Sequence, residues 1–474
     1  MSKEGKLIHN TMLIAISNIC TKFISFLMMP LYTSLLTTGE YGVVDMIATY
    51  TSLIAMGLNM QLEQGVFRYL VEARGNPQKQ NEYISGAFFL TISAIVVFVL
   101  IATPTLSLAG YAYTKYLVIS VAANILSALL LQIPRGIGDN KAYAGISCIS
   151  GVAHVLLNVL FVAVAKWGVD GMLQASILSH IITICLIVYQ ARIWERATLK
   201  SLQRGSLQEL MAYSLPLVPY VFTWWIISAS DRTIINFTIG VSFNGIYAVA
   251  NKFASTYTLA SNIFQLAWTE SASESVSEKD RNVFYQKVFD NAVKFYSSCC
   301  MGIIALMPFV FPVLVSDSFG DAYDYIPVLL IAALAHAVVA FYGSIYFAFK
   351  KTKKIISSTL LAAGLNIVIN LTMISRIGLY AAALSTLISY CVILVIRYME
   401  MKKIANITIN KTFLLGEVCI YIIVLLSYYS HNAILQGITL LGVISYCCAI
   451  NRHVIFSVIK RIKNKLVRRD GKSE

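Results

Sequence analysis

Runs of about 20 apolar residues recur along the whole chain, separated by short polar stretches. A helix of about 20 residues crosses the hydrocarbon core of a bilayer, and lipid permits only helices or closed barrels because every backbone polar group must be bonded internally. A barrel would show short alternating segments instead of continuous runs. We therefore predict an all-α polytopic membrane protein with about 14 transmembrane helices. Their expected positions are 10–36, 41–64, 83–104, 114–134, 144–165, 171–191, 213–238, 244–268, 288–312, 323–348, 356–375, 379–399, 411–430 and 434–456.

The composition supports this prediction. Hydrophobic residues make up 58% of the 474 residues and charged residues only 13%, whereas a soluble protein contains about 25% charged residues. So few charges exclude a soluble or disordered protein and, despite the net charge of +14, a nucleic-acid-binding protein. The nine cysteines fall in the expected helices and show no disulfide or metal-ligand spacing. Because no phosphate-binding loop, zinc-protease motif or nucleophile elbow occurs, we expect no enzyme, catalytic residue or metal site.

The basic residues are distributed asymmetrically across the predicted membrane. When a Lys or Arg within four residues of a span end is counted with the adjoining loop, 30 of the 37 Lys and Arg residues fall on one side, 3 on the other and 4 deeper within the spans. Cytoplasmic loops are enriched in Lys and Arg, so we predict that both termini are cytoplasmic. The four basic residues within spans are Lys22, Arg232, Lys252 and Lys294, and we expect Lys294 to extend toward the cytoplasmic surface.

Two halves of the chain show an internal repeat. At an offset of 206, Gly39, Tyr41 and Val43 align with Gly245, Tyr247 and Val249. At an offset of 210, residues 168–179 align with 378–389. We therefore predict two six-helix repeats of the same orientation, with a binding site between the halves, as in parallel-repeat transporters. The expected domains are 1–205, 206–405 and 406–474, the last comprising two extra helices and a basic cytoplasmic tail.

A stripe of polar residues follows one face of the second and of the eighth predicted helix. The stripes comprise Asp45, Thr49, Ser52, Met56, Asn59 and Glu63, and Asn251, Ser255, Thr258, Asn262, Gln265 and Thr269. Steps of 4 and 3 keep each set on one face, and each stripe spans about 27 Å at 1.5 Å per residue. Such a face cannot contact lipid, so it contacts either a partner helix through interhelical hydrogen bonds or an aqueous cavity. Matching stripes in both repeats favour the cavity, which makes Asn59, Asn251, Asn262 and Gln265 candidate substrate-binding residues.

Several charged residues fall inside the predicted spans. Lys22, which shares a helical face with Asn18, lies near the middle of the first span, and Asp45, Asp231, Arg232 and Lys252 lie in the outer half of theirs. A charge at the centre of a bilayer costs about 2.5–3.5 kcal/mol, so these side chains are expected to face a partner or a cavity. One interpretation is a cavity in which Lys22, Arg232 and Lys252 bind an anion, with the two acidic residues as candidates for ion coupling. The alternative is internal pairing, of Lys22 with Asp45 or of Asp231 with Lys252.

Two further pairs of polar residues align at an offset of 212. They are His154 and Asn158 on the fifth predicted helix and Asn366 and Asn370 on the eleventh. For these four residues we favour hydrogen bonding between packed helices over a role in binding.

Several glycine- and tyrosine-containing segments carry a family resemblance. They are LTTGEYGVVDM (36–46), GLNMQLEQGVFRYL (57–70), RGIGDNKAYA (135–144), WGVDGMLQASILSH (167–180) and NGIYAVANKFAS (244–255). With these segments, the chain resembles the polysaccharide transporter branch of the multidrug/oligosaccharidyl-lipid/polysaccharide exporter superfamily, in particular the Wzx-type O-antigen flippases. The resemblance covers the first twelve predicted helices.

This resemblance implies a V-shaped, two-lobe transporter of the bacterial inner membrane that moves an undecaprenyl-diphosphate-linked oligosaccharide to the outer leaflet by alternating access. Lys22, Arg232 and Lys252 would then contact the diphosphate and acidic sugars, and the Asn and Gln side chains the sugar hydroxyls. The last two helices would form a groove for the lipid tail. The resemblance implies H⁺ or Na⁺ coupling, with Asp45 and Asp231 as candidates, and no other cofactor.

Besides membrane lipid and the lipid-linked oligosaccharide, candidate partners are a polysaccharide polymerase and chain-length proteins. Two other functions remain open. A small-molecule cation antiporter of the multidrug branch would be expected to have a net acidic cavity, whereas the candidate cavity charges here are three basic side chains (Lys22, Arg232 and Lys252) and two acidic ones (Asp45 and Asp231). A non-transporting scaffold would leave the matched polar stripes unexplained.

Overall fold

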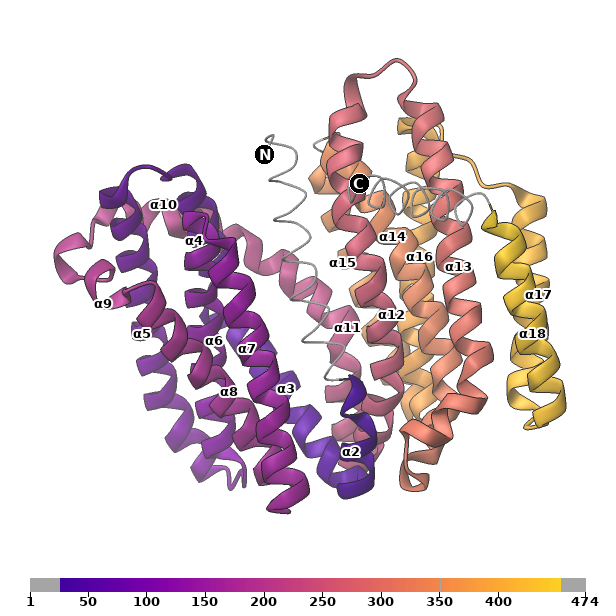
Figure 1. Cartoon of the computed structure of the whole chain (residues 1–474), viewed down its shortest axis with the longest axis horizontal. Coiled ribbons are helices and arrows are strands. Elements are labelled where there is room, and N and C mark those ends of the chain that lie inside the picture. The colour runs from indigo at the N-terminus through magenta and orange to yellow at the C-terminus, as the bar shows by residue number, and fades with distance from the viewer. Residues whose placement is uncertain (1–25, 350, 453–474) are drawn as a thin grey trace, which may run out of the picture. The chain divides into compact units, whose positions relative to one another are not determined.

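The computed structural model describes residues 26–349 and 351–452, and within these residues the chain is helical without β-strands (Figure 1). Lys22 and Asn18 lie outside the described residues. The α-helices are α2 (Met29–Leu35), α3 (Thr38–Leu58), α4 (Leu62–Glu72), α5 (Pro77–Leu108), α6 (Thr114–Ile137), α7 (Asn140–Asn158), α8 (Gly168–Gln190), α9 (Ile193–Arg196), α10 (Arg204–Ser214), α11 (Val218–Thr238), α12 (Val241–Glu274), α13 (Arg281–Leu314), α14 (Ile326–Ala348), α15 (Thr352–Ile377), α16 (Leu379–Ile404), α17 (Lys411–Tyr429) and α18 (Ala433–Ile450).

Twelve helical segments of the described chain are long and apolar enough to cross a membrane, which confirms the prediction of an all-α multi-pass protein. Two of the fourteen predicted spans are not among them. The span at 10–36 lies mostly outside the described residues. The span at 244–268 forms part of α12, which is 34 residues long. Its polar stripe lowers its mean hydropathy, so α12 is long enough to cross a membrane but is not among the twelve segments that are also apolar enough.

The described helices group into two compact units. One comprises the described residues up to Val249 together with Asn366–Ala382, and the other comprises Ala250–Leu365 and the residues from Ala383 onward. We call these the first and the second unit. Helix α12 therefore contributes Val241–Val249 to the first unit and its remainder to the second. These two units are not the three domains expected from the repeat, whose boundaries at residues 205 and 405 remain a prediction.

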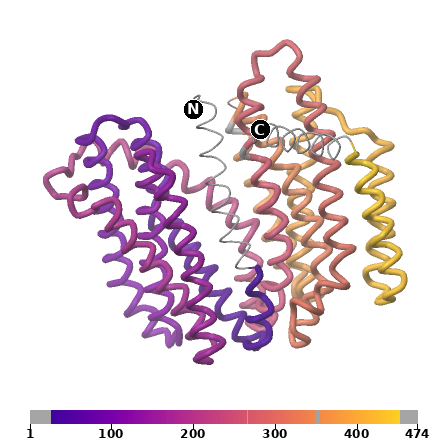
Figure 2. Tube along the Cα trace, viewed as in Figure 1, coloured from indigo at the N-terminus to yellow at the C-terminus, as the bar shows by residue number. Residues whose placement is uncertain are grey.

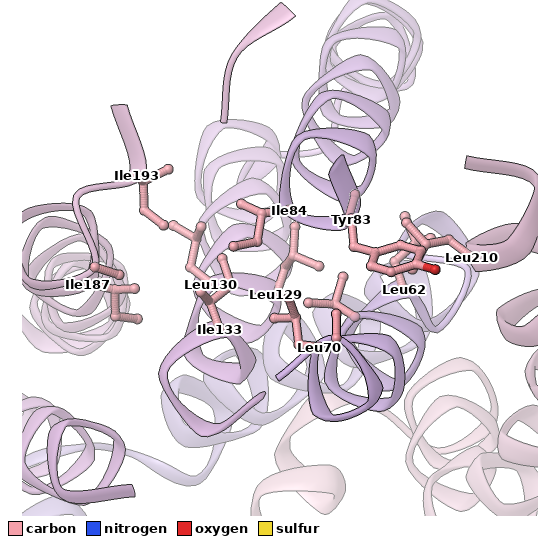
Figure 3. Close-up of a cluster of buried hydrophobic side chains, with 14 of the residues drawn as sticks. Leu62, Leu70, Tyr83, Ile84, Leu129, Leu130, Ile133, Ile187, Ile193 and Leu210 are labelled. Carbon is pink, nitrogen blue, oxygen red and sulfur yellow. The ribbon is translucent and has the colours of Figure 1, made fainter. Parts of the chain in front are cut away.

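An aliphatic cluster holds one end of the first unit together. Leu62 and Leu70 of α4 pack with Ile84 of α5, Leu130 of α6 and Leu210 of α10, all of them at most 1% exposed. Figure 3 shows these side chains converging from different helices. In the same unit, α6 packs against α5, α7 and α8, which run alongside one another (Figure 2). Aliphatic side chains from this many helices exclude water and fix the helix ends.

The second predicted span is broken and is not one continuous helix. Helix α3 ends at Leu58, and α4 begins at Leu62 after Met60 and Gln61, whose φ angles of 48° and 57° are left-handed. A left-handed backbone interrupts the helical hydrogen bonds and redirects the chain. The prediction that the polar stripe follows one continuous helical face from Asp45 to Glu63 is therefore wrong, because the helix ends before Asn59. Glu63 belongs to the next helix, although the Asn59 side chain still donates a hydrogen bond to its carboxylate.

Helices α3 and α12 cross at a pair of glycines in the first unit. A Cβ atom added to Gly42 would lie 2.0 Å from the carbonyl oxygen of Val241, and one added to Gly245 would lie 2.0 Å from that of Thr38. The backbones are therefore in direct contact, an approach that only glycine allows. The contact is reciprocal, and the two facing glycines, Gly42 and Gly245, are 203 residues apart in the sequence. This spacing differs by three residues from the offset of 206 at which the two repeats align.

In the second unit, aromatic rings pack between α12, α13 and α14. Trp268 stacks on Phe341 with ring centroids 4.5 Å apart, and its Nε1 donates to the Phe341 carbonyl at 3.1 Å. Phe289 stacks on Tyr342 with centroids 5.5 Å apart. Stacked rings of this kind add stability beyond the area that they bury.

Arg397 on α16 is buried in the second unit, with 1% of its surface exposed. Its Nη1 donates to the Val339 carbonyl on α14 at 3.0 Å, and its Nη2 donates to Thr359 Oγ1 on α15 at 3.1 Å. The count of Lys and Arg residues assigns Arg397, near the end of the predicted span 379–399, to the cytoplasmic loops, whereas the structure places it within α16. Its guanidinium bonds neighbouring helices, as a buried charge requires.

Candidate functional site

An ion pair joins α3 and α11 in the first unit. The Nε of Arg232 lies 3.3 Å from Oδ2 of Asp45, with 21% and 17% of the two side chains exposed. Arg232 Nη1 donates to Thr49 Oγ1 at 3.4 Å. The Nδ2 of Asn244 on α12 donates to Asp45 Oδ2 at 3.4 Å and to the Gly42 carbonyl at 3.2 Å. The ion pair therefore lies beside the glycine crossing, and its contacts connect α3, α11 and α12.

Asp231 occupies a different environment from its neighbour Arg232. Only 2% of it is exposed. The hydroxyl of Tyr247 on α12 donates to Asp231 Oδ2 at 3.0 Å, and Nδ2 of Asn370 on α15 donates to Oδ1 at 2.8 Å. The Oδ1 of Asn370 is buried without a hydrogen-bond partner in the described residues. A carboxylate beside an unused amide oxygen provides acceptor oxygens for a small cation.

The candidate charges thus differ in their contacts. Arg232 pairs with Asp45, a combination that differs from both pairings expected from the sequence, and Asp231 accepts hydrogen bonds from Tyr247 and Asn370. Lys252 is half-buried in the second unit. The pairing of Lys22 with Asp45 remains a prediction because Lys22 lies outside the described residues.

The polar stripe of α12 in the second unit is on a partly exposed face. Ser255 and Asn262 are exposed, and Asn251 and Gln265 are half-buried. Gln265 Nε2 donates to the Ala340 carbonyl at 3.3 Å. Thr269, at the end of the stripe, bonds Ser344 Oγ of α14 at 2.7 Å. The stripe therefore pairs with a neighbouring helix at its end, whereas its middle presents amide and hydroxyl groups at the surface of the unit.

An apolar cavity of about 670 Å³ lies in the second unit, lined by α13, α14, α16 and α17. Aliphatic and aromatic side chains form most of its wall. Polar groups line it at Asp290 and Lys294 on α13 and at Asn410, which caps the N-terminus of α17. The Lys294 ammonium lies 5.8 Å from the ring centre of Phe413. The cavity therefore combines an apolar interior with a few charged groups near the start of α17.

Glu417 on α17 also lines this cavity and is 5% exposed. Its carboxylate accepts hydrogen bonds from Ser297 Oγ on α13 and from the Tyr446 hydroxyl on α18, the latter at 2.8 Å. The carboxylate thus bonds α17 to two other helices. Glu417 is not among the residues predicted from the sequence, although it is the single acidic residue inside the predicted span 411–430, which is a usable signal.

Residues 7–267 match a protein family described as polysaccharide biosynthesis protein, so the match covers more than half of the chain. The chain belongs to this family. No match was found among curated proteins. Family membership and twelve apolar helical segments identify a multi-pass membrane protein of the polysaccharide biosynthesis family.

Solved structures of two transporter types share the fold of this family member. Lipid II flippase MurJ in an inward closed conformation has a TM-score of 0.69 at 14% sequence identity, with 94% of this chain and 100% of that chain covered. An inward-facing multidrug resistance MATE family transporter of the MOP superfamily has a TM-score of 0.67 at 14% identity, covering 82% and 96%. An outward-facing structure of such a MATE transporter has a TM-score of 0.61 at 13% identity, covering 85% and 95%. These likenesses confirm the fold that the resemblance implies.

Replacing Glu417 with leucine is expected to destabilise this polysaccharide biosynthesis family member by about 2 kcal/mol, because the partly buried Tyr446 hydroxyl would lose its acceptor and the buried Ser297 hydroxyl would keep only the Tyr421 oxygen at 3.3 Å. Glutamine retains an acceptor oxygen and should cost less. Thermal unfolding of the purified protein in detergent measures the difference. Glu270→Leu, at an exposed position of α12, is the control. A Glu417→Leu protein as stable as the wild type would show that this carboxylate does not hold α17 in place.

Proposed function

We propose that the protein is a flippase that moves an undecaprenyl-diphosphate-linked oligosaccharide, such as an O-antigen repeat unit, across the bacterial inner membrane by alternating access. The family match over residues 7–267 is the observation that carries this proposal. A fold shared with lipid II flippase MurJ supports a lipid-linked cargo. Both termini would be cytoplasmic, in keeping with the distribution of Lys and Arg. Membrane lipid, a polymerase and chain-length proteins are the proposed partners.

Basic residues within the spans would bind the diphosphate. The Arg232 side chain is still 21% exposed when it pairs with Asp45. Its guanidinium has five N–H donors, and the contacts with Asp45 and Thr49 do not use all of them. Guanidinium groups bind phosphate oxygens through pairs of N–H donors. Lys22 and Lys252 would supply further positive charge. In this role the Asp45 contact orients the guanidinium while the site is empty.

Neutral polar residues would bind the sugar. Asn262 is exposed on α12, and Asn251 and Gln265 are partly exposed along the same face. Amide side chains both donate and accept hydrogen bonds, which matches the hydroxyl groups of an oligosaccharide. Asn59 is buried at the end of α3 and has an unpaired Oδ1 among the described atoms, so its contribution would require the α3–α4 break to open.

The apolar cavity of the second unit would hold part of the lipid tail. Its aliphatic wall suits an isoprenoid chain, and its volume of about 670 Å³ accommodates a segment of one. Lys294 and Asp290 mark the polar end of the cavity. This assignment gives α17, one of the two helices outside the predicted repeat, a role in substrate binding.

Asp231 is the stronger of the two candidates for H⁺ or Na⁺ coupling. It is more deeply buried than Asp45, and the unpaired Asn370 Oδ1 could complete a cation site with its carboxylate. Asp45 already has a cationic partner in Arg232. We therefore assign ion coupling to Asp231 and orientation of Arg232 to Asp45.

A small-molecule cation antiporter is the second candidate, because MATE transporters share the fold. Such a cargo would be repelled by Arg232 and Lys252 unless neighbouring carboxylates neutralise them. Comparing the two cargo classes on the same purified protein would therefore separate these functions.

Replacing Arg232 or Lys22 with alanine is expected to abolish surface polysaccharide while the protein stays in the membrane, because the diphosphate would lose a positive partner. Surface polysaccharide and membrane abundance are measured in cells whose own gene is deleted. Arg376→Ala removes an exposed basic residue at the end of α15 and serves as the control. Normal polysaccharide in both test variants would contradict the assignment of these residues to the substrate site.

A further inference from the structure

The segment between α8 and α10 contains an exposed surface that the transport proposal does not use. It runs from Arg192 to Arg204 and includes α9 and the short 3-10 helix Leu199–Ser201. The segment follows one candidate membrane-spanning helix, Gly168–Gln190, and leads directly into the next, Arg204–Thr238. It must therefore lie at the boundary of the bilayer on the side where the basic residues gather. We call it the linker surface.

The linker surface is held rigidly by its inward-facing residues. Ile193 is 3% exposed and packs in the aliphatic cluster together with Leu210 (Figure 3). The Oγ of Ser85 donates to the Arg196 carbonyl at 3.0 Å and accepts from the Thr198 N–H at 3.1 Å. These contacts attach the backbone of the segment to α5.

The outward-facing side chains combine apolar and basic groups. Trp194 is 56% exposed and Leu199 is 72% exposed. The exposed basic residues beside them are Arg192, Lys200 and Arg204. Tryptophan at the headgroup level with Lys and Arg nearby is the composition of a segment that lies in a membrane interface. In water, the exposed Trp194 and Leu199 side chains would be unfavourable.

The charge of the linker surface is available to a ligand. From Arg192 to Arg204 there are four basic residues and one acidic residue, Glu195. Arg192 Nη1 lies 3.6 Å from Glu195 Oε1, but the two side chains are 68% and 55% exposed. An ion pair this exposed contributes little to stability, so Glu195 does not hold the Arg192 charge in place. The net positive charge therefore remains effective at the surface, where it attracts anionic lipid headgroups.

We propose that the linker surface binds anionic phospholipids of the adjoining leaflet, with Arg192, Lys200 and Arg204 contacting headgroup phosphates and Trp194 inserted at the level of the glycerol backbone. The occupant is the anionic phospholipid of the bilayer itself. The binding does not depend on the transported cargo, so it holds for a flippase and for an antiporter. Lipid bound here would tie the segment that joins the predicted repeats to the membrane surface.

Quenching of Trp194 fluorescence by brominated lipids tests this proposal. The full-length protein is placed in nanodiscs that contain either brominated phosphatidylglycerol or brominated phosphatidylcholine at equal mole fraction. The Trp194 signal is the difference between the wild type and Trp194→Phe. We expect brominated phosphatidylglycerol to quench this signal about twofold more strongly, and the preference to weaken as salt is raised.

The combined variant Arg192→Gln, Lys200→Gln and Arg204→Gln should lose the preference for phosphatidylglycerol. The matched control, Lys279→Gln with Lys287→Gln, removes exposed basic residues elsewhere and should keep it. All five side chains are exposed, so folding should be retained. Equal quenching by both lipids, or a preference that survives in the linker variant, would overturn the proposal. Relief of quenching by added undecaprenyl diphosphate would also overturn it, because the surface would then belong to the cargo.

Discussion

Leucine in place of Gly42 is expected to separate α3 from the first turns of α12 and to cost about 3 kcal/mol of stability or more. The smallest possible side chain would place its Cβ 2.0 Å from the Val241 carbonyl oxygen and 3.0 Å from the backbone nitrogen of Gly245. Backbone atoms cannot rotate away as a side chain can, so the helices must move apart. The movement would also break the Asn244 hydrogen bonds to Gly42 and Asp45 beside the crossing.

The measurement for Gly42→Leu is the abundance of the folded protein in membranes and its thermal unfolding in detergent. Gly57→Leu is a matched control, because Gly57 lies on the same helix and a Cβ there has no neighbour within 4 Å. Gly245→Leu should reproduce the defect, and the double variant should be little worse than either single variant because both break one contact. If the Gly42 and Gly57 variants were equally stable, the helix crossing would not contribute to the fold.

The membrane-spanning architecture could be predicted from sequence because a single strong requirement decides it. Lipid forces long apolar runs into helices, and the helices found at 114–137 and 411–429 nearly coincide with the predicted 114–134 and 411–430. The break at Met60 and Gln61 could not be predicted in this way. Neither residue is glycine, so the left-handed turn depends on tertiary packing, which hydropathy does not encode.

The candidate site was only partly accessible from sequence. In-span charges identified Asp45, Asp231 and Arg232, since each must avoid lipid. Which of them pair depends on helix rotation and crossing, so the Asp45–Arg232 contact was not anticipated. The predicted hydrogen bonding of Asn370 between packed helices is confirmed, but its partner, Asp231 on α11, could not be read from the sequence. Glu417 barely changes the mean hydropathy of its apolar span, so hydropathy does not reveal it. Its hydrogen-bond partners come from two other helices, which the sequence does not bring together.

Asparagine in place of Asp231 is expected to abolish the stimulation of transport by an ion gradient while leaving the protein folded. Asparagine has nearly the same shape, so it can still bond Tyr247, but it carries no negative charge to bind a cation. Without the carboxylate, the cation site proposed for Asp231 and Asn370 Oδ1 would contain only neutral oxygens. We expect the gradient-driven rate to fall by about tenfold or more, which corresponds to a rise of about 1.4 kcal/mol in the activation free energy.

Proteoliposomes loaded with a fluorescent lipid-linked oligosaccharide provide the measurement for Asp231→Asn, with an H⁺ or a Na⁺ gradient imposed separately. The ion whose gradient accelerates the wild type but not the variant is the coupling ion. Asp170→Asn, at an exposed position in the first turn of α8, is the control and should respond as the wild type does. Asp45→Asn should instead slow transport under every gradient, because it removes the partner that orients Arg232. A full response of Asp231→Asn to both gradients would exclude Asp231 from coupling, whereas the loss of response in Asp45→Asn alone would transfer that role to Asp45.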